Sequence, residues 1–109
     1  MNLLSSFSFS MVDEYPCEIE AKEISIDKLK EKIKNGEIDF KIGHPSFAEV
    51  LSQMLECKIE SVREKIKLKK GETAIIAQIF GNTRLPEGKI LSSQEIKKLE
   101  IRFIEITIK

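Results

Sequence analysis

The sequence predicts a single α/β domain, built as a mixed β-sheet of about five strands with about three helices. A length of 109 residues allows one domain and leaves no room for a second. Runs with β-type alternation and runs with helical spacing of apolar residues interleave along the chain, without an internal repeat or a low-complexity linker. One short connection that contains glycine, from Lys69 to Glu72, separates two β-rich runs and indicates an antiparallel hairpin.

The first third of the chain supplies two strands and a helix. Asn2 to Phe7 is a short, largely apolar run and predicts the first strand. Cys17 to Ile24 alternates between apolar and charged residues, which is typical of a half-buried strand. Ser25 is expected to cap a helix over Ile26 to Lys34, which the pair Asn35-Gly36 ends.

The middle of the chain supplies a second helix and the hairpin. Phe40 to Gly43 is expected to be a short extended connector, and Pro45 then opens a helix that runs to Glu56, because proline is well tolerated in the first helical turn. Val62 to Leu68 and Thr73 to Phe80 are the two predicted arms of the hairpin. The second arm is almost entirely apolar, which predicts a central strand.

The last third is expected to contain a loop, a short helix and a final strand. Gly81 to Gly88 has no periodicity and predicts a long loop. Ser92 and Glu95 have the spacing of a capping box, which opens a helix of about two turns that ends at Leu99. The run from Ile101 to Lys109 alternates and predicts the final strand.

Composition excludes several classes of function. Eighteen basic and eighteen acidic residues cancel, so the chain has no overall positive field for long nucleic acid. No apolar run approaches the length of about 20 residues that a membrane span needs, and no Lys or Arg precedes the first apolar stretch as in a secretory signal. We therefore expect a cytoplasmic protein that binds neither long nucleic acid nor a membrane.

Few residues are available as metal ligands. The two cysteines, Cys17 and Cys57, lie far apart and are expected to be reduced and partly buried. His44 is the single histidine, and the chain has three aspartates. We expect chemistry without a metal and without a cofactor.

Two loops carry polar groups next to predicted helix starts. One is Ile42-Gly43-His44-Pro45, and the other is Thr83-Arg84-Leu85-Pro86-Glu87-Gly88-Lys89. Functional residues concentrate on loops that a rigid scaffold holds in place. From the residues alone, His44 is a helix cap, a surface residue or a catalyst, and the second loop is a solvated surface or a site.

The order of these motifs resembles that of the small viral and prophage ring nucleases that act as type III anti-CRISPR proteins. The resemblance rests on the Ile-Gly-His segment entering a helix, the hairpin, an apolar strand that bears Gln78, the Arg-Leu-Pro-Glu-Gly-Lys loop and the terminal Phe-x-Glu-Ile strand. The opening segment Phe-Ser-Phe-Ser-Met is also similar. Where that family usually has an asparagine at the end of the first strand, this chain has Ser5.

The resemblance implies metal-independent cleavage of cyclic tetra-adenylate to linear di-adenylates, which would switch off the ancillary nucleases of type III CRISPR systems in the cytoplasm of the cell or of the infected host. The ribose 2′-hydroxyl is the nucleophile, so the enzyme aligns it, stabilises charge and protonates the leaving 5′-oxygen. His44 is the candidate general acid, since imidazole can donate a proton near neutral pH. Arg84 is the candidate phosphate clamp.

Each of the remaining candidates has alternative roles. Glu87 is expected to orient Arg84, accept from the 2′-hydroxyl or bind an adenine amino group. Lys89 adds charge or is a surface lysine. Ser8 and Ser10 are candidate ligand contacts or ordinary loop serines, and Gly43 offers backbone donors at a helix start.

Two other functions remain open from the sequence. One is a module that sequesters a cyclic oligonucleotide without cleaving it. The other is a dimeric DNA-binding regulator, although Asp27 and Glu31 interrupt the lysines of the first helix. For the enzyme we expect a homodimer with the ring on its two-fold axis, because two copies of His44 on opposite sides would produce di-adenylates.

Overall fold

The computed structural model describes residues 1–81 and 92–109, and within them five strands form one mixed sheet. The strands are β1 (Asn2–Leu4), β2 (Ile19–Ile24), β3 (Asp39–Lys41), β4 (Thr73–Phe80) and β5 (Glu100–Ile108). The helices are α1 (Ile26–Lys34), α2 (Pro45–Leu55) and α3 (Ser93–Lys97), and a 3₁₀ turn, η1, spans Phe9–Met11. The order across the sheet is β2-β5-β4-β1-β3, with β1 parallel to β3 and β4, and β5 antiparallel to β2 and β4. The predicted single α/β domain is therefore confirmed.

Local capping chemistry explains where two of the helices begin. The Ser25 hydroxyl accepts a hydrogen bond from the Lys28 amide at 3.1 Å, at the predicted start of α1. Ser92 and Glu95 form the predicted capping box, with distances of 3.1 and 3.2 Å between each side chain and the other residue's amide. The predictions of α1 and β4 were correct to the residue.

The predicted hairpin arm Val62 to Leu68 was wrong. Within it the structure has a single isolated bridge, between Leu68 and Val12, and β4 pairs instead with β1 and β5. The residues of β4 from Ala74 to Ala77 are fully buried, so its neighbours must be apolar on both faces. The segment from Arg63 to Lys67 carries four charges and cannot occupy that central position.

The fifth strand comes from a segment that was expected to be only a connector. β3 pairs in parallel with β1 along its whole length, from Asn2↔Asp39 to Leu4↔Lys41. β1 is also shorter than predicted, because the chain leaves the sheet at Ser5. Both differences arise from pairing between segments that are distant in sequence, which periodicity does not report.

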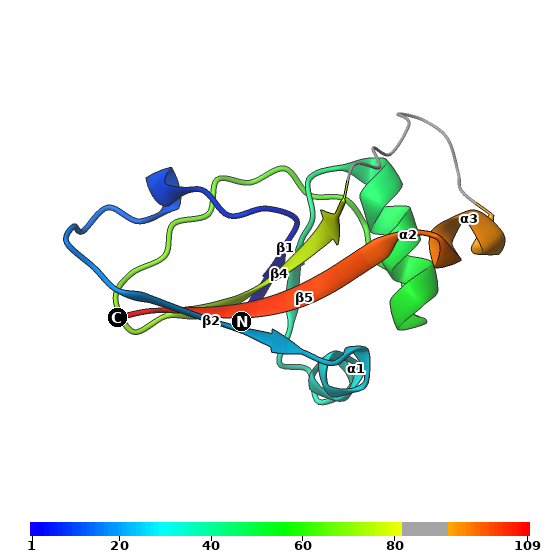
Figure 1. The fold of residues 1–109 in the computed structure, drawn as a ribbon, viewed down its shortest axis with the longest axis horizontal. Helices are drawn as coiled ribbons and strands as arrows, with labels where there is room; N and C mark the ends of the chain where they lie inside the picture. Colours follow the sequence, from blue (N-terminus) through cyan, green and yellow to red (C-terminus); the bar gives the residue numbers. More distant parts are fainter. Residues whose placement is uncertain (82–91) are drawn as a thin grey trace.

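The two faces of the sheet are covered differently. Helices cover one face, where the buried cluster includes residues of α1, α2 and α3 together with Leu3, Ile75 and Phe103 of the sheet. Long loops cover the other face, where Val12 and Leu68 pack on the sheet residues Leu4, Ala74, Ile76, Ile106 and Ile108. We call these the helix face and the loop face. In Figure 1, β5 leads from α3 to the C-terminus, and the loop between η1 and β2 lies near the C-terminal end of β5.

Two further expectations concern cysteines and membranes. Cys17 and Cys57 are both free and half-buried, as predicted, and burial raises the pKa of the Cys57 thiol. In the part of the chain that the structure describes, no helix is long and apolar enough to cross a membrane, and no three His, Cys, Asp or Glu side chains lie close enough to hold a metal ion.

Candidate functional site

The carboxyl ends of three parallel strands meet at one edge of the sheet. β1 lies between β3 and β4, so two strands that come later in the sequence pair with β1, one on each side. In open α/β sheets, ligands bind outside the carboxyl ends of the strands where the order reverses in this way. The fold therefore places a candidate site after Leu4 of β1 and Lys41 of β3.

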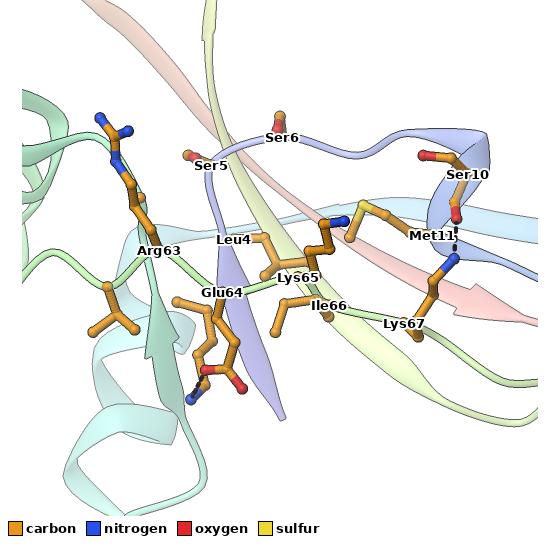
Figure 2. A pocket seen from close by; sticks show the side chains of 13 residues that line it. Leu4, Ser5, Ser6, Ser10, Met11, Arg63, Glu64, Lys65, Ile66 and Lys67 are labelled. Carbon is orange, nitrogen blue, oxygen red and sulfur yellow. Dashed lines mark hydrogen bonds and ion pairs between the residues drawn. The ribbon is translucent and has the colours of Figure 1, made fainter.

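A pocket of about 790 Å³ occupies this position (Figure 2). Its walls come from the end of β1 and the loop after it, from the end of β3, and from the segment that was wrongly predicted as a hairpin arm. The lining residues are Leu4, Ser5, Ser6, Ser10, Met11, Lys41, Gly43, Val62, Arg63, Glu64, Lys65, Ile66 and Lys67. A volume of this size is within the range of small-molecule sites.

Residues 62–68, which we call the strap, cross the end of β1 in extended conformation (Figure 2). One backbone hydrogen bond anchors each end of the strap. The Val62 amide donates to the Ile42 carbonyl at 2.8 Å, and the Leu68 amide donates to the Met11 carbonyl at 2.7 Å. Charged residues lie between these anchors, so the strap presents charge to the pocket.

The start of the strap is positioned by α2. The Ser52 hydroxyl donates to the Ala48 carbonyl at 2.7 Å and accepts from the Ile59 amide at 3.0 Å. Ile59 is itself buried on the helix face. The chain therefore enters the strap from a fixed point on the helix.

The pocket is lined by four cationic side chains and one carboxylate. Two of the cations have partners. Lys41 contacts Glu64 at 2.8 Å, which raises the pKa of the Lys41 ammonium, and Lys67 contacts Asp13 at 3.0 Å.

The other two cations, Arg63 and Lys65, have no carboxylate within ion-pair distance in the described residues. A guanidinium offers two parallel donors to phosphate or carboxylate oxygens, and an ammonium adds a point charge. The electrostatics of the pocket therefore favour an anionic ligand.

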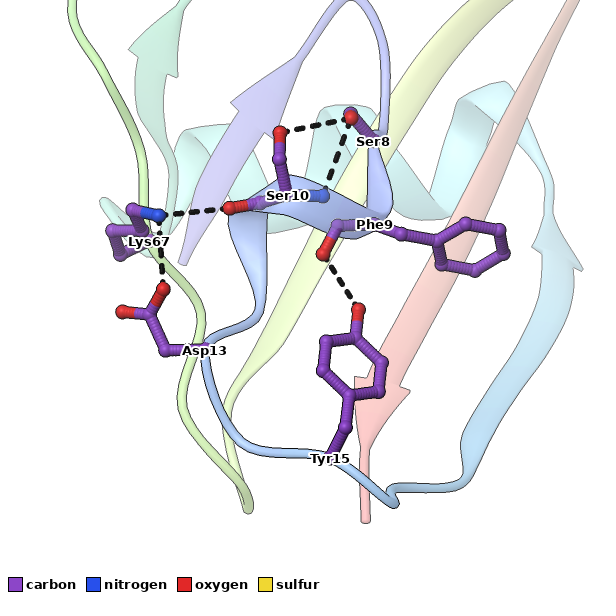
Figure 3. A network of polar contacts seen from close by, with 6 residues as sticks. All are labelled: Ser8, Phe9, Ser10, Asp13, Tyr15 and Lys67. Carbon is purple, nitrogen blue, oxygen red and sulfur yellow. Dashed lines mark hydrogen bonds and ion pairs between the residues drawn. The ribbon is translucent and has the colours of Figure 1, made fainter.

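The η1 turn forms the opposite wall and presents Ser10 (Figure 3). The Ser8 hydroxyl accepts from the Ser10 amide at 3.3 Å and lies 3.0 Å from the Ser10 hydroxyl. Lys67 of the strap donates to the Ser10 carbonyl at 2.8 Å. The turn and the strap are thus joined across the pocket.

Gly43 and His44 connect the pocket to α2. The Gly43 backbone lies against the strap, and the Cγ of Arg63 is 3.7 Å from the position that a Cβ on Gly43 would take. An alanine would make an ordinary contact there, so lack of space does not explain the glycine. His44 follows as the N-cap of α2, and its Nδ1 accepts from the Phe47 amide at 3.2 Å. This geometry assigns the ring hydrogen to Nε2, which is left available as a donor.

The predicted site residues are only partly gathered in the pocket. Ser10 and Gly43 line it, and Ser5 does so as well. Ser8 and His44 are not lining residues, but Ser8 contacts Ser10 and His44 adjoins Gly43. The other three candidates, Arg84, Glu87 and Lys89, lie outside the described residues.

The sequence reasoning missed the cations of the strap. A signal for them was present, because Arg63, Lys65 and Lys67 occupy alternate positions and an extended chain places alternate side chains on one side. Because that run was interpreted as a hairpin arm, its charges were not considered as part of a site. Recognition that three cations share one side of an extended segment would have identified this wall of the pocket.

Comparisons with known proteins agree with this fold. YddF of Bacillus subtilis (strain 168) is 29% identical over 104 residues, which cover 94% of each chain. Protein 26 of Sulfolobus islandicus filamentous virus (isolate Iceland/Hveragerdi) is 32% identical over 77 residues, or 71% of this chain and 64% of the viral protein. The solved structure of B116 from Sulfolobus turreted icosahedral virus is similar with a TM-score of 0.80 and 29% identity, over 97% of both chains. The model of the STIV B116-like family matches residues 1–105, and the chain therefore belongs to this family.

Proposed function

We propose that the protein is a metal-independent ring nuclease that cleaves cyclic tetra-adenylate to linear di-adenylates and thereby acts against type III CRISPR signalling. The observation that carries the proposal is the pocket at the carboxyl ends of β1 and β3. It combines the Ser10 hydroxyl and the adjoining His44 with two cations that have no carboxylate partner among the described residues. An oligonucleotide ring supplies several phosphates at short spacing, which is the chemistry that such a pocket recognises. The family resemblance of the loop motifs supplies the identity of the ring.

The proposed reaction uses a nucleophile from the substrate. The ribose 2′-oxygen attacks phosphorus and forms a new P–O bond, and its proton passes to solvent water. The bond to the 5′-oxygen breaks, the 5′-oxygen leaves as a hydroxyl, and the other product end carries a 2′,3′-cyclic phosphate. Arg63 and Lys65 neutralise the phosphate and stabilise the charge that develops on it. The Ser10 hydroxyl hydrogen-bonds to a phosphate oxygen and holds it in line for the attack.

His44 supplies a proton to the leaving 5′-oxygen from Nε2. In the structure the Nδ1 of His44 accepts a hydrogen bond from the Phe47 amide. A ring that carries hydrogens on both nitrogens cannot accept this bond, so the bond must break before His44 can act as an acid. A phosphate close to Nε2 favours the protonated ring by direct charge attraction. Binding of the ring would therefore convert a helix cap into a proton donor.

Arg84, Glu87 and Lys89 have roles that rest on the resemblance alone. They follow β4 in the sequence, and β4 ends at Phe80, at the same edge of the sheet as β1 and β3. We propose that Arg84 is a second phosphate clamp, that Glu87 orients it or binds a ribose hydroxyl or an adenine amino group, and that Lys89 adds charge.

The direct test is cleavage without metal. Purified protein is incubated with radiolabelled cyclic tetra-adenylate in EDTA, and the products are separated by chromatography. Linear di-adenylates support the enzyme, and intact ring retained by the protein supports sequestration. A ring that is neither bound nor cut overturns the proposal.

Sequestration without cleavage is the second candidate function. One observation favours it: His44 already has a structural role, because its Nδ1 caps α2. A binding module needs the cations and hydroxyls of the pocket but no proton donor. The same incubation separates the two functions.

We expect the active form to be a homodimer with the ring on the two-fold axis. Four phosphates divide equally between two protomers, and each protomer offers two cations, Arg63 and Lys65, that have no carboxylate partner in the described residues. Light scattering at micromolar concentration should give twice the mass of one chain. A monomer that keeps full activity would remove this expectation.

Glu64 is expected to oppose binding of the ring. Glu64 contributes a carboxylate to the pocket lining, and this carboxylate forms an ion pair with the Lys41 ammonium at 2.8 Å. Glu64→Gln should lower the Kd about two- to fivefold, since it removes a repulsive charge and releases a cation at a solvent-accessible site. Glu60→Gln is the matched control, because Glu60 pairs with Lys58 and does not line the pocket. Equal Kd values for both variants, measured by fluorescence titration, would contradict this expectation.

A further inference from the structure

We propose that Lys67 is a positioning residue, which places the Ser10 hydroxyl for reaction by tying the η1 turn to the strap. The proposal rests on the proposed function. It assigns to Lys67 a role different from that of the two cations beside it, although all three belong to the strap and line the same pocket.

The contacts of Lys67 distinguish it from Arg63 and Lys65. Its ammonium donates to the Ser10 carbonyl at 2.8 Å and to the Asp13 carboxylate at 3.0 Å (Figure 3). Both acceptors belong to the η1 region, more than fifty residues away in the sequence. Because Asp13 neutralises its charge, Lys67 contributes less attraction for a phosphate than a cation without a carboxylate partner does.

The η1 turn depends on outside partners for its position. The turn has three residues. The carbonyls of these three residues and of Ser8, which precedes them, all accept hydrogen bonds. The Ser8 carbonyl accepts from the Met11 amide, and the Phe9 carbonyl accepts from the Val12 amide and, at 2.6 Å, from the Tyr15 hydroxyl. These bonds shape the turn internally and do not fix its distance from the strap.

Among the described residues, two hydrogen bonds join the η1 turn itself to the strap. They are the Leu68 amide to the Met11 carbonyl, at 2.7 Å, and the Lys67 ammonium to the Ser10 carbonyl. The second acts on Ser10, which lines the pocket. The Ser8 hydroxyl also fixes Ser10, because it forms hydrogen bonds with both the amide and the hydroxyl of Ser10. Without Lys67 the turn stays attached at Met11, but Ser10 can move relative to Arg63 and Lys65 on the opposite wall.

The test removes the tie without a change in net charge. In the variant Asp13→Asn with Lys67→Met, both partners of the ion pair become neutral. The rate of single-turnover cleavage of cyclic tetra-adenylate should fall about tenfold or more, since small misplacements of a reacting group have effects of this size. The salt dependence of binding should stay the same, because no free cation is lost. Asp13→Asn alone leaves the bond to the Ser10 carbonyl and should cleave at a rate close to wild type.

Lys65→Met is the matched control for loss of charge. It removes a cation that has no carboxylate partner in the described residues, so it should weaken binding of the ring and flatten the salt dependence of binding. The neutral variant of residues 13 and 67 should instead leave the salt dependence of binding unchanged and lower the cleavage rate, a pattern that would not arise if Lys67 were merely structural. Thermal unfolding of each variant confirms that it is folded.

A double-mutant cycle gives the sharpest result. If Lys67 acts through Ser10, the neutral variant should lower the rate little further when Ser10→Ala is already present. A full additional loss in that background would overturn the positioning role, as would an unchanged rate in the neutral variant itself. A wild-type protein that neither binds nor cleaves the ring would instead overturn the proposed function, and the positioning role with it.

Discussion

The variant His44→Asn should lose most cleavage of cyclic tetra-adenylate and keep both its fold and its affinity for the ring. A general acid acts on the leaving oxygen in the transition state, and its loss typically lowers the rate about 10²–10⁴-fold. Asparagine is a good N-cap, so its side-chain oxygen can accept the Phe47 amide in place of Nδ1. The dissociation constant should change by less than about tenfold, because the cations of the pocket are untouched.

A comparison with His44→Ala separates the two roles of the histidine. Alanine removes the cap as well as the imidazole, so it should lower the free energy of unfolding by about 0.5–2 kcal/mol, whereas asparagine should leave it nearly unchanged. Single-turnover rates of the two variants should be equally low. If His44→Asn instead cleaves at a rate near that of wild type, the histidine is only a cap and the catalytic assignment is wrong.

The parts of the fold that were predicted correctly depend on local chemistry. Ser25 caps α1, and Ser92 with Glu95 caps α3, because side chains within one helical turn satisfy the free amides. The run Thr73–Phe80 is so apolar that a central strand is its most favourable environment. Each of these inferences needed only residues that are close in sequence.

The parts that were wrong depend on competition between distant segments. By their sequence pattern, both β1 and the strap were candidates to pair with β4 as a neighbouring strand. The charges at positions 63–65 and 67 exclude the strap, because the sheet is covered on both faces. The consequence for the site is large. Displaced from the sheet, the strap crosses the end of β1 and supplies most of the cations of the pocket.

The candidate site could be predicted only where the signal was local. Gly43 and Ser10 were proposed from loops next to expected elements, and both line the pocket. Ser8 and His44 were also proposed, but neither lines the pocket: Ser8 contacts the lining residue Ser10, and His44 follows the lining residue Gly43. Ser8 accepts a hydrogen bond from the backbone of η1 and His44 from that of α2, and spacing in the sequence does not predict these bonds. Arg63 was missed because its importance comes from the position of the strap.

The variant Arg63→Met should weaken binding of cyclic tetra-adenylate by about tenfold to a hundredfold, which corresponds to roughly 1.5–3 kcal/mol for a hydrogen bond to a charged group. Arg63 has no carboxylate within ion-pair distance in the described residues, so its guanidinium is available for a phosphate, and it is exposed, so its loss should not change thermal unfolding.

The matched control is Arg102→Met, because Arg102 is partly exposed, stacks on the Phe80 ring at 4.6 Å, pairs with Glu100 and does not line the pocket. Arg63→Lys should restore only part of the affinity, since an ammonium cannot donate two parallel hydrogen bonds. The logarithmic salt slope of binding should also fall by about 0.7 in Arg63→Met, the value for one phosphate contact on a single strand. Equal dissociation constants for Arg63→Met, Arg102→Met and wild type, measured by fluorescence titration at fixed salt, would show that the strap does not hold the phosphates and that the anion site lies elsewhere on the chain.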